Sequence, residues 1–401
     1  MRTTPTIVAV LAGAAITLNA QSLADDLALL DVTGRPRDPR TNATVVAPPP
    51  GAKISPGSTG TSPFSYESHA RLETGLALTA IADHYTKYVA GSRWKLEARR
   101  EDGDVIAAAR FAGTNAASES ITALLTIARL TPTRVDVAVR IFRRTPAQTP
   151  PPPRSPLPAD DRAAALVLLR APSSAAVQDA APDGFPSDVL PAGAKVIAVA
   201  SVPPAQTFLI AVAPAFDATQ FAPHLQRLVD AGWIDEVGFL GGFRNPRGLG
   251  TQLCHGQQEV DVLLTPRDAG GSYLMVHTGP PGCRPSRDLP LRDTALPVLL
   301  PPPGVWSHGS GVGVGVDSQH FGTQLVGRER LAPVAAHFLD QMTKSGWPTV
   351  ARIADDVMSV SLHRSKTSRG DAVTAVLSVA DVSEAGMLDA WLRIIRNNPQ
   401  K

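Results

Sequence analysis

Three short segments of the chain carry apolar residues at helical spacing, and each ends at a glycine followed by a tryptophan. Steps of three and four residues place the apolar side chains on one face of a helix. Two segments end at Gly232-Trp233 and Gly346-Trp347, and one ends at Gly91, with Trp94 after two further residues. The apolar sets are Leu78, Ile81, Tyr85 and Tyr88; Phe221, Leu225, Leu228 and Val229; and Leu331, Val334, Phe338 and Met342.

A proline- or alanine-rich corner that ends in glycine precedes each of these helices. The corners are 48–51 (PPPG), 191–193 (PAG) and 301–304 (PPPG). From the corner glycine to the tryptophan the intervals are 43, 40 and 43 residues. Near-equal intervals between the same two landmarks predict a structural unit that is repeated three times.

Strand patterns follow each tryptophan. Residues 135–141 (VDVAVRI) alternate with a period of two, as a half-buried strand does, and Asp102-Gly103 has the composition of a tight hairpin turn. We therefore predict a meander of about three antiparallel strands after each helix. Residues 383–397 return to helical spacing, with Met387, Trp391 and Ile395 on one face, and predict an amphipathic C-terminal helix.

These patterns predict an α+β fold of three tandem modules, each a helix packed on a small antiparallel sheet, joined by Pro-rich linkers. Proline is abundant, at 37 of 401 residues, and it clusters between the periodic segments. The predicted divisions are an export signal peptide (1–20), a disordered or loop-rich lead (21–62), the first module (63–144), a linker (145–188), the second module (189–284), a second linker (285–303) and the third module with the C-terminal helix (304–401).

The Gly-Trp helix ends have a structural interpretation. Glycine adopts the left-handed conformation that ends a helix without steric cost, and a buried tryptophan covers up to ~250 Å². We therefore assign a packing role to Gly232, Gly346, Trp94, Trp233 and Trp347. The alternative is that the three tryptophans form an aromatic binding surface.

The N-terminus has the pattern of an export signal. Arg2 supplies a positive charge, residues 7–18 are an apolar run, and Asn19-Ala20-Gln21 offers a small-residue cleavage point. The run is roughly 12 residues, shorter than the ~20 that a membrane-spanning helix needs. We expect an exported protein, periplasmic or secreted, with no membrane span after signal cleavage. The alternatives are an uncleaved anchor and a buried helix.

The chain has two cysteines, Cys254 and Cys283. In an oxidising compartment such a pair tends to form a disulfide, and this one would close a loop of about 30 residues. Two free thiols, or a metal site completed by His255 and His277, are the alternatives. Compact zinc sites generally contain a closely spaced Cys or His pair of defined separation, which is missing here.

The sequence gives only weak signals for other kinds of functional site. The glycines of 311–315 (GVGVG) lack the spacing of a dinucleotide loop, and Ser310 lies between glycines at the wrong spacing for a hydrolase nucleophile. Arg244 and Arg247 could bind a carboxylate or phosphate, but such a pair is more often part of a solvated turn. The net charge of +2, without a basic cluster, argues against nucleic-acid binding.

The leading functional hypothesis is a non-enzymatic exported protein of the bacterial envelope, with a binding or structural role. The partner is unknown; an envelope protein or a polysaccharide fits, and no cofactor or metal is predicted. The alternative is an exported hydrolase whose active site is assembled between modules and therefore leaves no pattern in the linear sequence.

Overall fold

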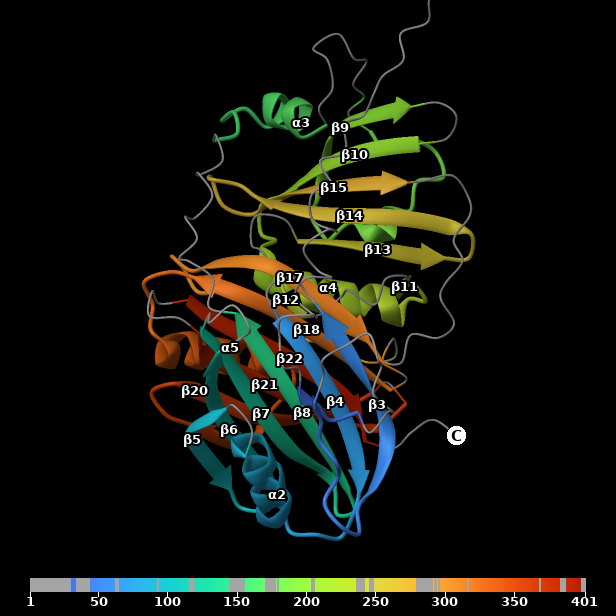
Figure 1. The fold of residues 1–401 in the computed structure, drawn as a ribbon. Coiled ribbons are helices and arrows are strands. Elements are labelled where there is room, and N and C mark those ends of the chain that lie inside the picture. Colours follow the sequence, from blue (N-terminus) through green and yellow to red (C-terminus); the bar gives the residue numbers. More distant parts are fainter. Residues whose placement is uncertain are drawn as a thin grey trace, which may run out of the picture. The chain divides into compact units, whose positions relative to one another are not determined.

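The computed structural model divides the chain into two compact units, residues 1–145 and 146–401, and each is described by itself. Strand and helix positions are shown in Figure 1. The structure describes residues 30–33, 44–61, 65–91, 94–114, 120–143, 156–169, 178, 180–202, 206–235, 242–244, 249–278, 291, 294, 296–315, 317–367, 369–382 and 387–397.

The first unit contains a six-stranded antiparallel sheet and one described helix. The strand order is β3-β4-β8-β7-β6-β5, and a two-residue parallel pair, β1-β2, lies beside it. The elements are β1 (Leu30–Asp31), β2 (Thr44–Val45), β3 (Lys53–Thr61), β4 (Ser65–Glu73), α2 (Leu78–Ala90), β5 (Lys95–Asp102), β6 (Ile106–Thr114), β7 (Ser120–Thr131) and β8 (Arg134–Arg143).

The second unit contains two more six-stranded antiparallel sheets, ordered β9-β10-β15-β14-β13-β11 and β17-β18-β22-β21-β20-β19, and a parallel pair, β12-β16. Its elements are α3 (Asp161–Leu169), η1 (Ser187–Val189), β9 (Lys195–Val202), β10 (Gln206–Ala213), α4 (Ala218–Asp230), β11 (Ile234–Asp235), β12 (Gly242–Phe243), β13 (Leu249–His255), β14 (Gln258–Pro266), β15 (Ser272–Thr278), β16 (Val298–Leu299), β17 (Trp306–Val314), β18 (Ser318–Val326), α5 (Leu331–Lys344), β19 (Thr349–Ala354), β20 (Met358–Lys366), β21 (Ala372–Asp381) and β22 (Met387–Arg396).

All three six-stranded sheets have the same connectivity. Numbered along the chain within each sheet, the spatial order is first, second, sixth, fifth, fourth, third, and a helix connects the second strand to the third. The last strand therefore returns to pair with the second strand in the middle of the sheet. We refer to the three sheets as sheets 1, 2 and 3 in chain order.

A glycine turn of one kind leads into each sheet. Gly51, Gly193 and Gly304 have φ of 82°, 77° and 81°. In each turn the residue after glycine donates its backbone N–H to the carbonyl three residues earlier, at 3.0, 3.1 and 3.0 Å. These bonds and positive φ values are those of a type II turn, whose third position requires glycine. The three corners seen in the sequence are therefore the same turn.

The helix ends at Gly232 and Gly346 also share one geometry. Their φ values are 97° and 80°. The Trp233 N–H donates to the Leu228 carbonyl at 3.0 Å, and the Trp347 N–H donates to the Met342 carbonyl at 2.9 Å. Together with the bonds from the two glycine N–H groups, this is the Schellman motif. Gly91 differs, because its φ of −71° is right-handed.

The three tryptophans are buried, with exposed fractions of 2% for Trp94 and Trp233 and 1% for Trp347. Each belongs to the apolar cluster that contains the adjacent helix and one face of its sheet. Trp233 also donates its indole N–H to the Asp188 carboxylate at 2.7 Å. The described side chains thus place these rings inside the protein.

The predicted fold class is wrong. Strand accounts for 52% of the structure and helix for 18%, so antiparallel sheets dominate and the chain is not built of α+β modules with one helix on a small sheet. The sequence indicates strands at 195–202, 207–213 and 309–316, but the prediction missed both strands before the first helix and the second strand before the third helix. One of them, Lys53–Thr61, contains serine, glycine and proline without an apolar period and was assigned to loop.

The predicted C-terminal helix is also wrong, because Met387–Arg396 forms strand β22. This strand pairs with both β18 and β21, and all ten of its residues are buried. A strand that is buried on both faces has no reason to alternate apolar and polar residues. Its apolar positions therefore matched helical spacing by coincidence.

Among the described residues, no helix combines the length and the apolar content that crossing a bilayer requires.

Replacing Gly346 tests the Schellman geometry. No atom lies within 4 Å of an added Cβ there, so Gly346→Ala is penalised through its positive φ alone. We expect a loss of about 1–2 kcal/mol in the free energy of unfolding, measured by chemical denaturation. Gly91→Ala is the control, since its φ is right-handed and the cost should be absent. Equal effects of the two substitutions would contradict the assignment.

Candidate functional site

Four side chains form a row across the face of sheet 2 that is opposite α4; we call it the outer row. The backbone register pairs Phe208 with His277, His277 with Asp261, and Asp261 with Gln252, so the four lie side by side on strands β10, β15, β14 and β13. Their chain neighbours Leu209, Val276, Val262 and Leu253 point to the other face, into the cluster that contains α4. Alternation along each strand thus fixes which face the outer row occupies.

The outer row is held by direct contacts. His277 Nδ1 lies 3.0 Å from Asp261 Oδ2, and the Phe208 ring stacks on the imidazole at 4.3 Å with an interplanar angle of 17°. A carboxylate only accepts hydrogen bonds, so Nδ1 carries the proton in this contact. The other ring nitrogen, Nε2, is buried and has no hydrogen-bond partner among the described residues.

The outer row is accessible at its polar end. The exposed fractions are 23% for the His277 side chain and 47% for the Asp261 side chain, and Phe208 and Gln252 are half-buried. A carboxylate that orients an imidazole is one part of a general base. The same set, an aromatic ring beside a carboxylate, an imidazole and an amide, also suits a polar ligand that is held by hydrogen bonds.

A second histidine pair lies inside sheet 3. His363 Nε2 is 2.8 Å from Ser361 Oγ, and Nδ1 is 3.0 Å from the Trp347 carbonyl. A serine next to an oriented histidine is the arrangement of a nucleophile and its base. Here the two residues are only 2% and 0% exposed. A substrate cannot reach them in this arrangement.

The environment of His363 shows that its role is structural. Burial lowers the pKa of His363 from 6.5 to about 4, although the Trp347 carbonyl opposes the shift. The ring is therefore neutral at pH 7. As a neutral ring it donates Nδ1–H to the Trp347 carbonyl and accepts from the Ser361 hydroxyl, which holds the chain segment that follows α5.

One histidine recurs at the seventh position of each sheet-associated helix. His84, His224 and His337 place Nε2 at 2.9, 3.0 and 3.1 Å from the carbonyls of Ala47, Val189 and Leu300. Each of these carbonyls lies four residues before a corner glycine. The three histidines thus contact equivalent chain segments, and at the third helix Gln341 Nε2 lies 2.7 Å from His337 Nε2 and bonds the same carbonyl. We call these three contacts the corner clamps.

A second side chain reinforces each corner clamp. The Tyr88 hydroxyl donates to the Val45 carbonyl at 2.9 Å, and Arg227 donates to the Asp188 carbonyl at 3.2 Å. Gln341 bonds the backbone of Leu300 in both directions, at 2.8 and 3.0 Å. The residue type differs among the three helices, while the target is always the segment before the corner.

The sequence contains a signal for the corner clamps that the predicted repeat does not use. Residues 82–84, 222–224 and 335–337 all read Ala-x-His, at the same distance from the start of each helix. The landmarks that define the repeat in the sequence are glycine, proline and apolar residues, and histidine is not among them. A histidine in a sequence is more readily interpreted as a catalytic or metal-binding residue than as a contact between a helix and a backbone carbonyl.

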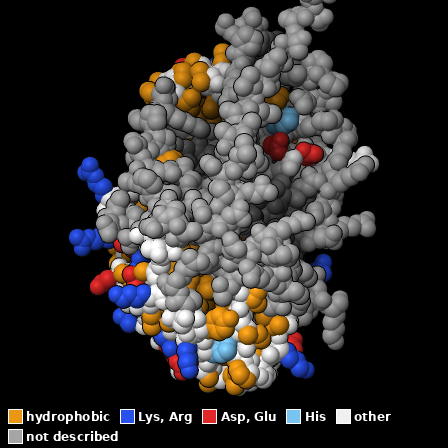
Figure 2. All heavy atoms as spheres, in the orientation of Figure 1, with side chains coloured by type: hydrophobic (Ala, Val, Ile, Leu, Met, Phe, Trp, Pro, Cys, Tyr) orange, Lys and Arg blue, Asp and Glu red, His pale blue; other side chains and the backbone are white. Residues whose placement is uncertain are grey.

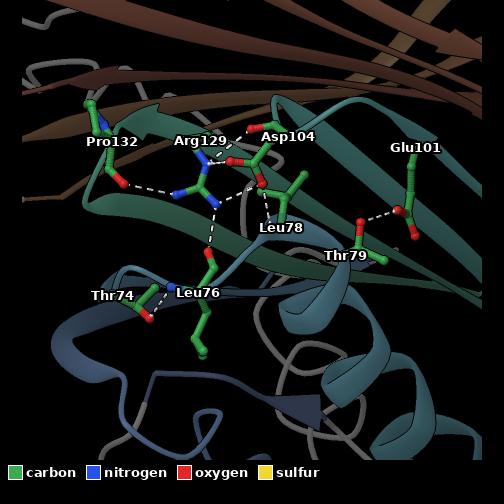
Figure 3. A network of polar contacts seen from close by, with 8 residues as sticks. All are labelled: Thr74, Leu76, Leu78, Thr79, Glu101, Asp104, Arg129 and Pro132. Carbon is green, nitrogen blue, oxygen red and sulfur yellow. Dashed lines mark hydrogen bonds and ion pairs between the residues drawn. The ribbon is translucent and has the colours of Figure 1, made fainter.

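A polar network fixes the start of α2 (Figure 3). The Asp104 carboxylate accepts the Leu78 N–H at 2.5 Å and pairs with Arg129 at 2.7 Å. Arg129 also donates to the Leu76 and Pro132 carbonyls, at 2.8 and 3.1 Å. Burial raises the pKa of Asp104, but the Leu78 N–H and the Arg129 guanidinium outweigh it, so the pKa lies below its usual value. The network caps the helix.

Charged side chains of both signs surround the edge strand β5, visible at the lower left of Figure 2. Arg99 pairs with Asp83 and with Glu101, and Arg110 pairs with Glu97. Alternating charges on an edge strand oppose pairing with another sheet edge. This surface is not a concentrated basic or acidic patch.

The remaining sequence candidates lie only partly within the described residues. Cys254 is buried on β13, whereas Cys283 lies outside the described residues, so the disulfide stays a prediction. His255 lies against Trp233, with ring centroids 5.3 Å apart. No group of three or more His, Cys, Asp or Glu side chains arranged for a metal occurs in the part of the chain that the structure describes. Arg247 and the side chain of Ser310 are outside that part too.

Comparison with known proteins supplies no family. No protein-family model matches the chain, and no curated protein matches it. A solved structure of a candidate thioesterase II from Thermobifida fusca YX aligns with 82% of this chain and 91% of its own, at 10% identity and a TM-score of 0.15. Similarity at that level carries no information about fold or function.

The pH dependence of stability tests the environment of His363. Between pH 6.5 and about 4 the unfolded chain binds a proton at this residue and the folded chain does not. The free energy of unfolding should therefore fall by about 1.4 kcal/mol per pH unit through this one group as the pH decreases. His363→Gln should lack this contribution, and His255→Gln should keep it. Equal slopes in the two variants would contradict the buried neutral ring.

The predicted disulfide has a direct test. Non-reducing peptide mass spectrometry of the exported protein should find Cys254 joined to Cys283. Reduction should lower the free energy of unfolding by roughly 3–4 kcal/mol, as expected for a loop of this length. Two free thiols in the exported protein would contradict the pairing.

Proposed function

We propose that the chain is an exported, non-enzymatic binding protein of the bacterial envelope and that the outer row on sheet 2 is its contact surface. The observation that carries the proposal is the half-exposed, polar and aromatic character of this row, in which Asp261 and Phe208 both contact the His277 ring.

The chemistry of the outer row favours a ligand with hydroxyl or amide groups. Asp261 and Gln252 supply acceptors and donors, and Phe208 supplies an apolar contact beside them. Envelope polysaccharides and the backbone of envelope proteins both carry such groups. Export rests on the N-terminal sequence pattern, which lies outside the described residues.

The second candidate function is an exported hydrolase that uses the Asp261–His277 pair as its general base. The 3.0 Å contact between His277 Nδ1 and the carboxylate is the one observation in its favour. A nucleophile would have to approach Nε2, and no described hydroxyl is bonded to that atom. The binding function needs no such further group, and we therefore rank it first.

Two variants of the outer row test the proposal. Phe208→Ala and Asp261→Asn should each reduce co-sedimentation with insoluble cell-wall polysaccharide, or capture of a specific protein from an envelope extract, by about tenfold, the ratio that corresponds to 1.4 kcal/mol. His255→Ala is the matched control, because this exposed histidine lies on the opposite face of the same sheet. Unchanged binding by both row variants, with the control also unchanged, would contradict the proposal. Hydrolysis of chromogenic esters or glycosides that is lost in His277→Gln would favour the enzyme instead.

A further inference from the structure

A short segment, Leu30–Thr33, is inserted into the core of the first unit. Its strand β1 pairs in parallel with β2 over two residues only, Leu30 with Thr44 and Asp31 with Val45. The Val46 N–H donates to the Asp31 carbonyl at 2.8 Å. The side chains of Leu30 and Val32 are 1% and 0% exposed and belong to the cluster that contains α2. The segment is therefore bound by main-chain bonds and two apolar contacts.

A serine on β4 adds a specific polar contact. Ser68 Oγ accepts the Val32 N–H at 2.8 Å and donates to the Asp31 carboxylate at 3.2 Å. Main-chain pairing, alternate apolar side chains and one polar contact are the elements of recognition by strand addition. The place occupied by β1 has these features of a site for an extended peptide, and we call it the strand seat.

Sheet 3 has an equivalent strand seat, and the strand that occupies it comes from a different part of the chain. Strand β12 pairs in parallel with β16, which precedes the third corner as β2 precedes the first. The Gly242 N–H donates to the Pro297 carbonyl at 2.8 Å, and Phe243 packs against Phe338 of α5, with ring centroids 5.3 Å apart. Along the chain, β12 comes between β11 and β13, which both belong to sheet 2. The seat of sheet 3 is thus occupied by a segment from a neighbouring sheet.

From the recurrence of the seat we infer that the strand seat of the first unit binds Leu30–Thr33 of a second copy of this chain, in exchange for its own segment. The segment known to fit is Leu30–Thr33, and every copy carries it. Sheet 3 shows that a seat of this kind accepts a strand donated across sheets. Exchange of an identical element between copies links them with contacts already present in the single chain. This interaction is independent of the outer row.

Cross-linking between two variants of the full chain tests the exchange. A mixture of Asp31→Cys and Ser68→Cys proteins is treated with a short thiol-reactive cross-linker, and mass spectrometry identifies the peptide that joins positions 31 and 68. We expect a covalent dimer through these positions. A mixture of Asp31→Cys and Glu73→Cys is the matched control, because Glu73 is exposed at the far end of the same strand β4. Its dimer yield should be about tenfold lower, since five residues of strand at about 3.3 Å each separate positions 68 and 73.

The double variant Asp31→Cys/Ser68→Cys shows whether the seat geometry is right. It should cross-link within one chain at low protein concentration. If it does so while the mixture yields no dimer above the control, the segment does not exchange and the inference is wrong. If the double variant also fails to cross-link, the seat itself is wrong. These cross-linking results do not depend on whether the outer row binds a polysaccharide or a protein.

Amide hydrogen exchange of the wild-type chain gives a second test that needs no substitution. Exchange between copies requires β1 to leave its seat without unfolding of the sheet. The Val32 and Val46 amides, which are bonded within the seat, should therefore exchange much faster than the Val137 and Val139 amides of the central strand β8. Equal protection of the two sets would show that β1 opens only on global unfolding, which would overturn the inference.

Discussion

The contact on which each sheet depends is the one between a helix histidine and the backbone carbonyl four residues before the corner glycine. The turn fixes where the first strand begins, and the histidine fixes where the helix lies relative to that turn. The strand order then follows, because the helix returns the chain to the far edge and the last four strands run back to the centre. At the C-terminal ends of two of the helices a Schellman motif directs a tryptophan into the apolar layer, so these helix ends are fixed by backbone hydrogen bonds.

The degree of burial distinguishes polar groups that stabilise the fold from polar groups that can contact a ligand. Ser361 and His363 have the contact of a catalytic pair, yet they lie beneath α5 and hold the carbonyl of Trp347. Asp261 and His277 make a similar contact at a half-exposed position, where Phe208 supports the ring from one side. The difference is the face of the sheet, because alternation places Ser361 and His363 toward α5 and places Asp261 and His277 on the face of sheet 2 opposite α4. Residue identity alone therefore does not show which histidine contacts a ligand.

The sequence allowed part of this structure to be predicted. The glycine corners and the Gly-Trp ends are local, because positive φ is a property of single residues, and they were identified from spacing alone. The fold class was not, because strands such as Lys53–Thr61 and Met387–Arg396 form through long-range pairing and carry no period of their own. The outer row was invisible for a related reason. Phe208, Gln252, Asp261 and His277 meet only through the register of four strands, and no linear motif encodes that register.

The tautomer of His224 is the measurement that tests the corner clamp most directly. Its Nδ1 faces Arg227 Nη2 at 3.1 Å, and since arginine only donates, the ring proton belongs on Nε2, toward the Val189 carbonyl. Burial and the Arg227 charge lower the pKa of His224, against the effect of the Val189 carbonyl, so the ring should gain its second proton at a lower pH than an exposed histidine does. Imidazole ¹⁵N chemical shifts of the full chain should show an Nε2–H tautomer that persists to a lower pH than the neutral form of an exposed histidine. An Nδ1–H tautomer, or a ring that averages and titrates like an exposed histidine, would contradict the clamp.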